Sequence, residues 1–135
     1  MLLFPKKTKY KKVKKGKLKK FTFKNYTLKH GTVGLKTLES GIITARQLES
    51  ARQTINRKIK RKGKIWIKIF PSLPVTSKPN EARMGKGKGN VSHWCSKVSS
   101  GTIIFEVINN NNKDSINALL SGKHKLPVKS KIITY

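Results

Sequence analysis

Glycine and lysine alternate in one segment of this sequence, RMGKGKGN at residues 83–90. Glycine has no Cβ, so its backbone can adopt positive φ and lie close against another surface. Successive exposed N–H groups can bind an anion, and the cations between them add positive charge. We therefore predict a flexible cationic loop that fits a phosphate-rich groove, with an ordinary solvated loop as the simpler alternative. The residues of this loop are Arg83, Met84, Gly85, Lys86, Gly87, Lys88, Gly89 and Asn90.

The sequence contains no pattern typical of catalysis or metal binding. The glycine spacing of the loop matches neither G-x-G-x-x-G nor the P-loop pattern. His93 and Cys95 are two residues apart on a predicted strand, so their side chains would share a face, as a Cys–His nucleophile or half of a metal site requires. There is no second cysteine, and the five acidic residues are scattered singly. We expect a binding protein with no enzyme activity, no metal and no cofactor.

The composition indicates a polyanionic partner. The chain has 32 Lys and Arg against five Asp and Glu, a formal net charge of +27 over 135 residues. Such charge opposes compaction, whereas neutralising phosphates releases counterions and favours binding to nucleic acid. An anionic membrane is the second candidate, but no apolar segment approaches the roughly 18 residues of a membrane span. We expect an intracellular protein that binds nucleic acid and no membrane.

Residues 5–20 form a basic arm with ten lysines in sixteen positions. Like charges keep such a segment extended and disordered in water, and we predict that it orders on RNA. A solubilising tail or a localisation signal is the alternative. We divide the chain into this arm, residues 1–20, and a single domain, residues 21–135. The arm residues predicted to bind RNA are Lys6, Lys7, Lys9, Tyr10, Lys11, Lys12, Lys14 and Lys15.

A helix is predicted from Ala45 to about Lys62. Thr44 and Gln47 have the spacing of a capping box, and Gly63 stands where a helix C-terminus is expected. An apolar stripe for the core is formed by Leu48, Ala51, Ile55 and Ile59. The cations of this segment predicted to contact RNA are Arg46, Arg52, Arg57, Lys60 and Arg61. A merely solvated face would carry interspersed acids, but only Glu49 is present.

Alternation of apolar and polar residues predicts strands, most regularly over Lys64–Phe70. Ile65, Ile67 and Ile69 share one face of that strand. We interpret Trp66, on the other face, as a core residue rather than a platform for a base.

Other elements are predicted less regularly. Strands are expected over residues 21–28 and 33–38, a basic strand or tail over 126–135, and a hairpin over 91–98 and 102–108. Residues 71–80 contain three prolines and predict an irregular segment that projects the glycine loop from the domain. A short helix is expected to begin at Asp114 or Ser115 and to end at Gly122.

Several motifs occur in the order and spacing of one protein family. They are PKKTKY at 5–10, GTVGL at 31–35, TARQLESAR at 44–52, GKIWIKIF at 63–70, PVT with KP at 74–79, RMGKGKGN at 83–90, IFE at 104–106 and KLPVK at 125–129. Each motif alone is weak, but together they are specific. Over nearly its whole length, the chain resembles the large-subunit ribosomal protein L-sixteen family.

This resemblance implies an α+β domain in which two helices pack on antiparallel strands. It implies a structural role in the large ribosomal subunit, with binding to rRNA near the central protuberance and the cleft of the aminoacyl-site tRNA. The arm would thread into rRNA, and the glycine loop would reach towards the tRNA. Neighbouring large-subunit proteins would be further partners, and no homo-oligomer is expected. A free-standing nucleic-acid chaperone is the alternative.

Some features depart from the family pattern. Residues 109–122 are rich in Asn where an Ala-rich helix is usual, which leaves the length and packing of the second helix open. Lys (27) far outnumbers Arg (5), so point charges replace bidentate phosphate contacts, and the bias indicates an AT-rich coding source. Trp94 and the turn at residues 99–101 resemble mitochondrial members. Because the family-like start is at Met1, we expect no presequence. We therefore expect a mitochondrial ribosome, with a plastid or the bacterial cytoplasm as alternatives.

Overall fold

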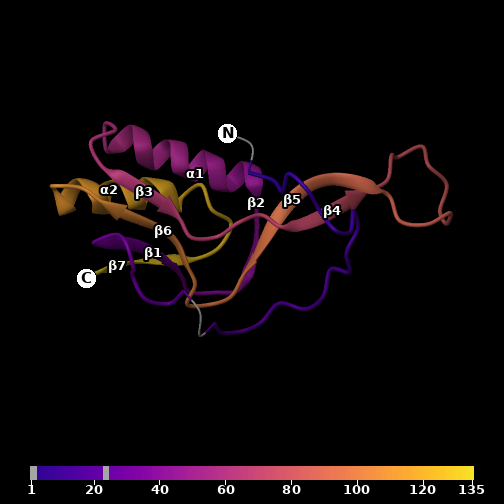
Figure 1. Cartoon of the computed structure of the whole chain (residues 1–135), viewed down its shortest axis with the longest axis horizontal. Coiled ribbons are helices and arrows are strands. Elements are labelled where there is room, and N and C mark those ends of the chain that lie inside the picture. The colour runs from indigo at the N-terminus through magenta and orange to yellow at the C-terminus, as the bar shows by residue number, and fades with distance from the viewer. Residues whose placement is uncertain (1–2, 23–24) are drawn as a thin grey trace.

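The computed structural model describes residues 3–22 and 25–135, which form two helices and seven strands. In chain order they are β1 (Val33–Thr37), β2 (Gly41–Thr44), α1 (Ala45–Lys58), β3 (Lys64–Ile67), β4 (Leu73–Ser77), β5 (Asn90–Val98), β6 (Ile103–Ile108), α2 (Asn112–Lys123) and β7 (Ser130–Thr134). The strands build a four-stranded antiparallel sheet, β3-β6-β1-β7, and a three-stranded one, β2-β5-β4. Both helices lie beside the larger sheet, and the smaller sheet extends away from them (Figure 1). The expected α+β fold is confirmed.

Helix α1 begins at the predicted capping box. Thr44 Oγ1 accepts the N–H of Gln47 at 3.2 Å, and Gln47 Oε1 accepts the N–H of Thr44 at 3.0 Å. The predicted apolar stripe is buried, comprising Leu48, Ala51, Ile55 and Ile59. It packs in one core with inward residues of the four-stranded sheet, including Val33, Leu35, Phe105 and Val107. Each large side chain buried in this way contributes about 1.5–3 kcal/mol.

The end of α1 differs from the prediction, because the helix stops earlier, at a Schellman motif with Ile59 as the C-cap. The N–H of Lys60 donates to the oxygen of Arg57 at 3.1 Å, and that of Arg61 to Asn56 at 3.2 Å. Lys60 and Arg61 have φ of 54° and 62°, values usually left to glycine. Both cations consequently sit on an exposed turn rather than on the helix itself.

Two glycines that were expected to end helices are sites of close packing instead. A Cβ on Gly63 would lie 2.4 Å from the backbone oxygen of Ile108 in β6. A Cβ on Gly122 would lie 2.5 Å from Cγ1 of Ile55 in α1. The absence of a side chain at these positions therefore lets α1 and its connection approach β6 and α2.

Helix α2 is longer than expected. Its N-cap is Asn111, whose Oδ1 accepts the N–H of Lys113 at 3.1 Å, so the helix begins before Asp114 or Ser115. It spans 12 residues and runs through the predicted end to Lys123. Its buried positions are mostly small, namely Ser115, Ala118, Leu119 and Gly122. The Asn-rich segment thus supplies a full, closely packed second helix.

A buried carboxylate fastens a loop to the other face of the four-stranded sheet. Glu106 is fully buried, and its Oε2 accepts the N–H groups of Lys29, His30 and Gly31 at 3.2, 2.7 and 3.1 Å. Its Oε1 lies 3.4 Å from Nζ of Lys68. Burial raises the pKa of this carboxyl, but the backbone donors and Lys68 lower it more, so that the pKa lies below its ordinary value.

The hairpin predicted from residues 91–98 and 102–108 is wrong. Strand β5 pairs with β2 and β4, whereas β6 pairs with β1 and β3, so the chain changes sheets between them. Thr37 holds this crossing, because its Oγ1 donates to the oxygen of Ser99 at 2.7 Å and accepts the N–H of Thr102 at 3.0 Å. Gly101 provides the turn with φ of 88°. The turn predicted at residues 99–101 is therefore present, but it connects strands of two different sheets.

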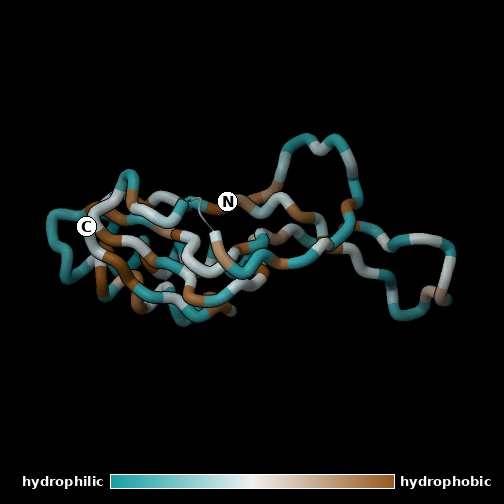
Figure 2. Tube along the Cα trace, turned by 90° about the horizontal axis from the view of Figure 1, so that it is seen from below, coloured by the Kyte–Doolittle hydropathy of each residue, from teal (hydrophilic) through white to brown (hydrophobic). Residues whose placement is uncertain are grey.

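Residues 71–80, expected to be irregular, contain strand β4. It lies at the edge of the three-stranded sheet, where Pro74 is tolerated because an edge strand has one unpaired side. Strands β4 and β5 form a hairpin whose connection, residues 78–89, projects from the body as predicted (Figure 1). The arm and this projecting connection are mainly hydrophilic (Figure 2).

The strand predicted over residues 64–70 is shorter than expected and ends at Ile67. Ile65 and Ile67, which were predicted only to share a face, pack against the core. Trp66, however, lies outside the core cluster, half-buried, with its ring centroid 5.7 Å from that of His30. The interpretation of Trp66 as a core residue is therefore wrong.

The remaining predicted strands have mixed outcomes. Those over residues 33–38 and near the C-terminus are confirmed as β1 and β7. The described part of residues 21–28 forms only an isolated bridge, between Phe21 and Ser100. Phe23 of that prediction and the start at Met1 lie outside the described residues. Within the part of the chain described, neither helix has the length and apolar character to cross a membrane.

Candidate nucleic-acid interface

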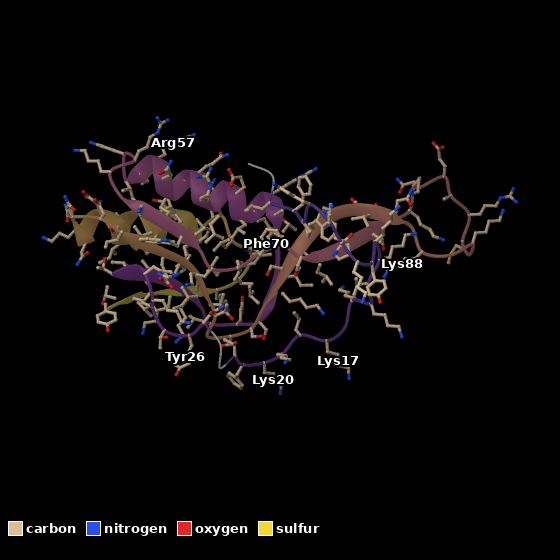
Figure 3. The ribbon with its side chains drawn as sticks, in the orientation of Figure 1. Lys17, Lys20, Tyr26, Arg57, Phe70 and Lys88 are labelled. Atoms are coloured by element: carbon tan, nitrogen blue, oxygen red, sulfur yellow. The ribbon has the colours of Figure 1, made fainter. Side chains whose placement is uncertain are left out.

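The residues predicted to bind rRNA or tRNA come from three segments of the chain: the arm, the glycine loop, and α1 with its C-terminal turn. All are exposed except Arg52 and Gly89, which are partly buried. Figure 3 shows Lys88 at the projecting hairpin and Arg57 towards the opposite end of the molecule, on the C-terminal part of α1. The cations therefore do not converge on one site but are spread along the long axis.

The glycine loop combines left-handed backbone with unused hydrogen-bond donors. Gly85, Lys86 and Gly87 have φ of 86°, 53° and 87°. Within the described residues, no N–H of residues 84–88 donates a hydrogen bond. Met84 is 95% exposed, and a Cβ on either of the two left-handed glycines would meet nothing within 4 Å. Free N–H groups beside cationic side chains are what an anion-binding loop requires.

The third glycine of the loop has a different role. A Cβ on Gly89 would lie 2.3 Å from the oxygen of Ser77, so this glycine lets the two ends of the loop approach each other. Nζ of Lys78 donates to the oxygen of Gly85, across the loop. The base of the loop is thus fixed by the chain itself, while its tip stays open.

The arm runs alongside the hairpin that carries the loop. Nζ of Lys12 donates to the oxygen of Lys88 at 2.6 Å, and Nζ of Lys88 donates to the oxygen of Val13 at 2.8 Å. Further along, Nζ of Lys97 donates to the oxygen of Lys15. Residues 3–20 contain no helix or strand. The arm and the loop therefore form one continuous cationic surface, and ordering of the arm on RNA stays a prediction.

A concave surface, apart from the arm and the glycine loop, lies at the C-terminal end of α1. It is an open depression of about 460 Å³ lined by Gln53, Asn56, Arg57, Lys60 and Arg61. Three cations can neutralise phosphates there, and the two side-chain amides can donate to phosphate or sugar oxygens. Arg57, Lys60 and Arg61 were predicted from the sequence to contact RNA, but Gln53 and Asn56 were not. Gln53 lies four residues before Arg57 and Asn56 four before Lys60, a spacing that would have placed each amide beside a cation on the same side of a helix.

The two remaining cations of α1 differ in their availability. Arg46 is exposed and makes no hydrogen bond or ion pair with any described residue. Arg52 is paired with Glu49, with Nη2 2.7 Å from Oε1 and Nε donating to Oε2 at 2.9 Å. The hydrogen bond from Arg52 is the largest cause that lowers the pKa of Glu49, to about 2. Glu49 thus stays ionised near neutral pH, and Arg52 offers RNA less free charge than Arg46.

His93 and Cys95 have different hydrogen-bond partners and make no hydrogen bond with each other among the described residues. Cys95 is fully buried and donates through Sγ to the oxygen of Leu73 at 3.5 Å, and burial raises the pKa of its thiol. His93 places Nδ1 3.4 Å from Oγ of Ser92. Among the described residues, no three His, Cys, Asp or Glu side chains are grouped so as to hold a metal ion.

Comparison with known proteins gives one consistent result. Residues 5–133 match the family described as ribosomal protein L16p/L10e. The large ribosomal subunit protein uL16 of Caulobacter vibrioides (strain NA1000 / CB15N) is 45% identical over 133 residues, which cover 98% of this chain and 93% of that protein. The uL16 proteins of Bartonella quintana (strain Toulouse) and Halorhodospira halophila (strain DSM 244 / SL1) are 47% and 45% identical over 132 residues, which cover 98% of this chain and 96% of each relative.

These relatives are bacterial and give no support to a specifically mitochondrial likeness. The match covers almost the whole chain, including the arm, both helices and the glycine loop. The proteins of this family are ribosomal and not enzymes. The chain belongs to the ribosomal protein L16p/L10e family.

Proposed function

We propose that this protein is a structural constituent of the large ribosomal subunit and binds large-subunit rRNA. Its family membership, its net charge of +27 and the exposure of nearly all the predicted RNA-binding cations support this role. Within the subunit, the proposed position is near the central protuberance, beside the cleft that receives the aminoacyl-site tRNA. Neighbouring large-subunit proteins are the proposed protein partners.

The observation that carries the proposal is the hairpin β4–β5 with its projecting tip. Its loop offers free N–H groups next to Arg83, Lys86 and Lys88, and the arm follows one side of it. A phosphate-lined cleft provides the complementary charge and accepts a backbone without bulky side chains. In the proposed arrangement, the arm and the C-terminal end of α1 bind rRNA, and the loop faces the tRNA.

Sedimentation of a tagged chain from cell extracts tests this role. We expect the protein to migrate with the large subunit through moderate salt. Replacing Lys12, Lys14 and Lys15 together by Gln should lower the salt concentration at which it dissociates, because fewer phosphates are neutralised. The matched control replaces Lys113, Lys125 and Lys129 by Gln, three exposed lysines on and after α2. A wild-type chain that leaves the subunit at moderate salt yet still binds free RNA would support the chaperone alternative instead.

The proposed compartment is an organellar ribosome, with a mitochondrion as the first choice. The support is compositional, since 27 Lys against 5 Arg is the bias of an AT-rich coding source. The bacterial relatives fit a bacterial cytoplasm equally well. Locating the gene decides between them: an organelle genome supports the proposal, and a bacterial chromosome overturns it.

A further inference from the structure

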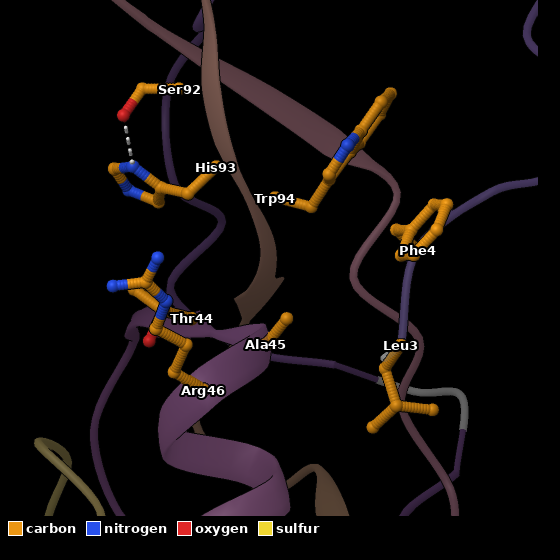
Figure 4. Close-up of a pocket in the computed structure, with 8 residues that line it drawn as sticks. All are labelled: Leu3, Phe4, Thr44, Ala45, Arg46, Ser92, His93 and Trp94. Carbon is orange, nitrogen blue, oxygen red and sulfur yellow. Dashed lines mark hydrogen bonds between the residues drawn. The ribbon is translucent and has the colours of Figure 1, made fainter. Parts of the chain in front are cut away.

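A pocket at the N-terminal end of α1 brings three distant segments of the chain together (Figure 4). Its volume is about 330 Å³. The arm, the start of α1 and strand β5 contribute its lining residues, which are Leu3, Phe4, Thr44, Ala45, Arg46, Ser92, His93 and Trp94. The pocket is separate from the glycine loop and from the depression at the other end of α1.

The pocket has an aromatic side and a polar, cationic side. Figure 4 shows the rings of Phe4 and Trp94 on one side and the side chains of His93 and Arg46 on the other. Phe4 is 45% exposed and Trp94 is partly buried, and no ring contact joins them within the described residues. Each ring therefore has surface left for a planar ligand.

The charges around the pocket favour an anionic ligand. Arg46 has no partner among the described residues, and none of the described lining residues is acidic. Arginine binds phosphate through a planar fork of donors, and Oγ of Ser92 and the ring nitrogens of His93 add hydrogen-bonding atoms. A fatty acyl chain or an apolar protein side chain would leave this polar side without partners.

We propose that the pocket binds a single unpaired nucleotide of RNA, with its base stacked against the rings of both Trp94 and Phe4 and its phosphate held by Arg46. This inference rests on the proposed rRNA-binding function and specifies one of its sites. Stacking on an aromatic ring accepts any base, because every base has a π face. A base inside a regular duplex cannot enter, so the ligand is a nucleotide from a loop, a bulge or an end.

Tryptophan fluorescence tests the stacking directly. The sequence has two tryptophans, so Trp66→Phe leaves Trp94 as the only one. The probes are three RNA hairpins: one with a single-nucleotide bulge, one in which that nucleotide is abasic, and one fully paired. All three should bind through charge, but only the bulged hairpin should quench the emission of Trp94.

Affinities measured by filter binding give a second readout that does not depend on tryptophan. Phe4→Ala should reduce the preference for the bulged over the paired hairpin by about 5-fold or more, the smallest loss expected for one stacked base. Arg46→Gln should also reduce this preference, because the phosphate of the bound nucleotide loses its charged partner. The matched controls are Phe70→Ala, an aromatic residue that is 50% exposed outside the pocket, and Lys113→Gln, which removes an exposed cation on α2. Both controls should leave the preference unchanged.

The outcomes separate this inference from the proposed function. Equal quenching by all three hairpins, or an equal loss of preference in Phe4→Ala and Phe70→Ala, would overturn the pocket assignment and leave rRNA binding intact. A wild-type chain that fails to migrate with the large subunit would overturn the proposed function itself. If Trp66→Phe does not fold, the preference ratios of the other four variants still decide.

Discussion

Glu106 is a single carboxylate that organises one face of the larger sheet. Its Oε2 collects three consecutive N–H groups, from Lys29 to Gly31, so the protein supplies its own anion to a backbone nest. A carboxylate buried without such donors would cost several kcal/mol. If residues 29–31 moved away from the sheet, the buried carboxylate of Glu106 would lose its hydrogen-bond donors. The energetic cost of that loss holds the segment in place.

The first prediction concerns the pH dependence that Glu106 imposes. Because its folded-state pKa lies below the unfolded value of about 4.3, the carboxylate stabilises the fold above that pH, and this stabilisation is lost as the pH falls through the folded pKa. We expect Glu106→Gln to lower the free energy of unfolding by about 1–3 kcal/mol at pH 7 and to flatten its decline in acid.

Urea unfolding of the two proteins between pH 7 and pH 2 measures both effects. Glu81→Gln is the control, because Glu81 is exposed in the projecting connection. Glu49, with a pKa of about 2, contributes its own decline at the acid end in all three proteins. A Glu106→Gln variant with the same acid slope as the wild type would contradict the assignment.

At the residue scale, local interactions were readable from the sequence and distant ones were not. The capping box of Thr44 and Gln47 was predicted because its two members are three residues apart. The backbone donors to Glu106 are 75–77 residues away, so the sequence showed only an isolated acid. One signal was present, since a lone carboxylate in the otherwise apolar run IIFEVI must be buried with partners.

Helix α1 separates a folding face from a binding face, and this is the second prediction. Ile55 is fully buried in the core and Arg57 is exposed. Ile55→Ala should cost about 2–5 kcal/mol of stability, through lost burial and the cavity left behind. Arg57→Gln should leave stability nearly unchanged and give weaker RNA binding with a shallower salt dependence. Thermal unfolding and RNA titration at several salt concentrations measure both, and the reverse pattern would mean that the faces are exchanged.

The close contact of α1 with α2 gives the third prediction. The added methyl group of Gly122→Ala would lie 2.5 Å from Cγ1 and 2.8 Å from Cδ1 of Ile55, so the helices must move apart, at a cost of about 1–3 kcal/mol. In the double variant with Ile55→Ala, the new methyl group enters the space that the larger side chain left. The two costs should therefore sum to more than the cost of the double variant. Strict additivity in denaturant unfolding would show that the two sites do not touch.

At the element scale, the sequence predicted helices better than strand partners. Helices follow from local periodicity, whereas the partner of a strand depends on residues far along the chain. Strands β5 and β6 were predicted to form a hairpin because a Ser-Ser-Gly turn joins them. However, β5 pairs with β2 and β6 pairs with β1, in different sheets, and Thr37 binds the segment between them. Pro74 argued against a strand, and only its position at a sheet edge explains why β4 forms.

The fourth prediction concerns the backbone of the glycine loop. Gly87 has φ of 87°, and Gly87→Ala should strain it by about 1 kcal/mol although no atom of the chain lies within 4 Å of the new methyl group. Folding should change little, whereas aminoacyl-tRNA binding by gradient-purified subunits should weaken. Gly87→Asn tolerates positive φ better and is the control for strain.

The charge of the loop is tested separately. Replacing Lys86 and Lys88 by Gln should weaken tRNA binding more than subunit assembly. Normal tRNA binding by all of these variants would show an ordinary solvated loop.

Over the whole molecule, charge and packing are segregated. One core lies between the helices and the four-stranded sheet, while the arm and the projecting hairpin are hydrophilic and cationic (Figure 2). A net charge of +27 strains the free chain by self-repulsion, and a polyanion relieves that strain. The parts with the fewest apolar contacts should therefore be the ones that depend most on RNA.

The arm is where this dependence should be greatest, and it gives the last prediction. Its contacts with the hairpin are exposed lysine–carbonyl hydrogen bonds, which water can replace at little cost, and it contains no helix or strand. Leu3 packs against the core at one end, and Phe21 bridges to Ser100 at the other, so the arm is a tethered loop. We expect trypsin to cut residues 6–20 of the free protein rapidly and to cut them slowly in the assembled subunit, while α1 resists in both. Because lysines are cut wherever they are exposed, the turn at Lys60 and Arg61 serves as an internal reference. An arm as resistant as the core of the free protein would show that the hairpin alone, and not RNA, holds it in place.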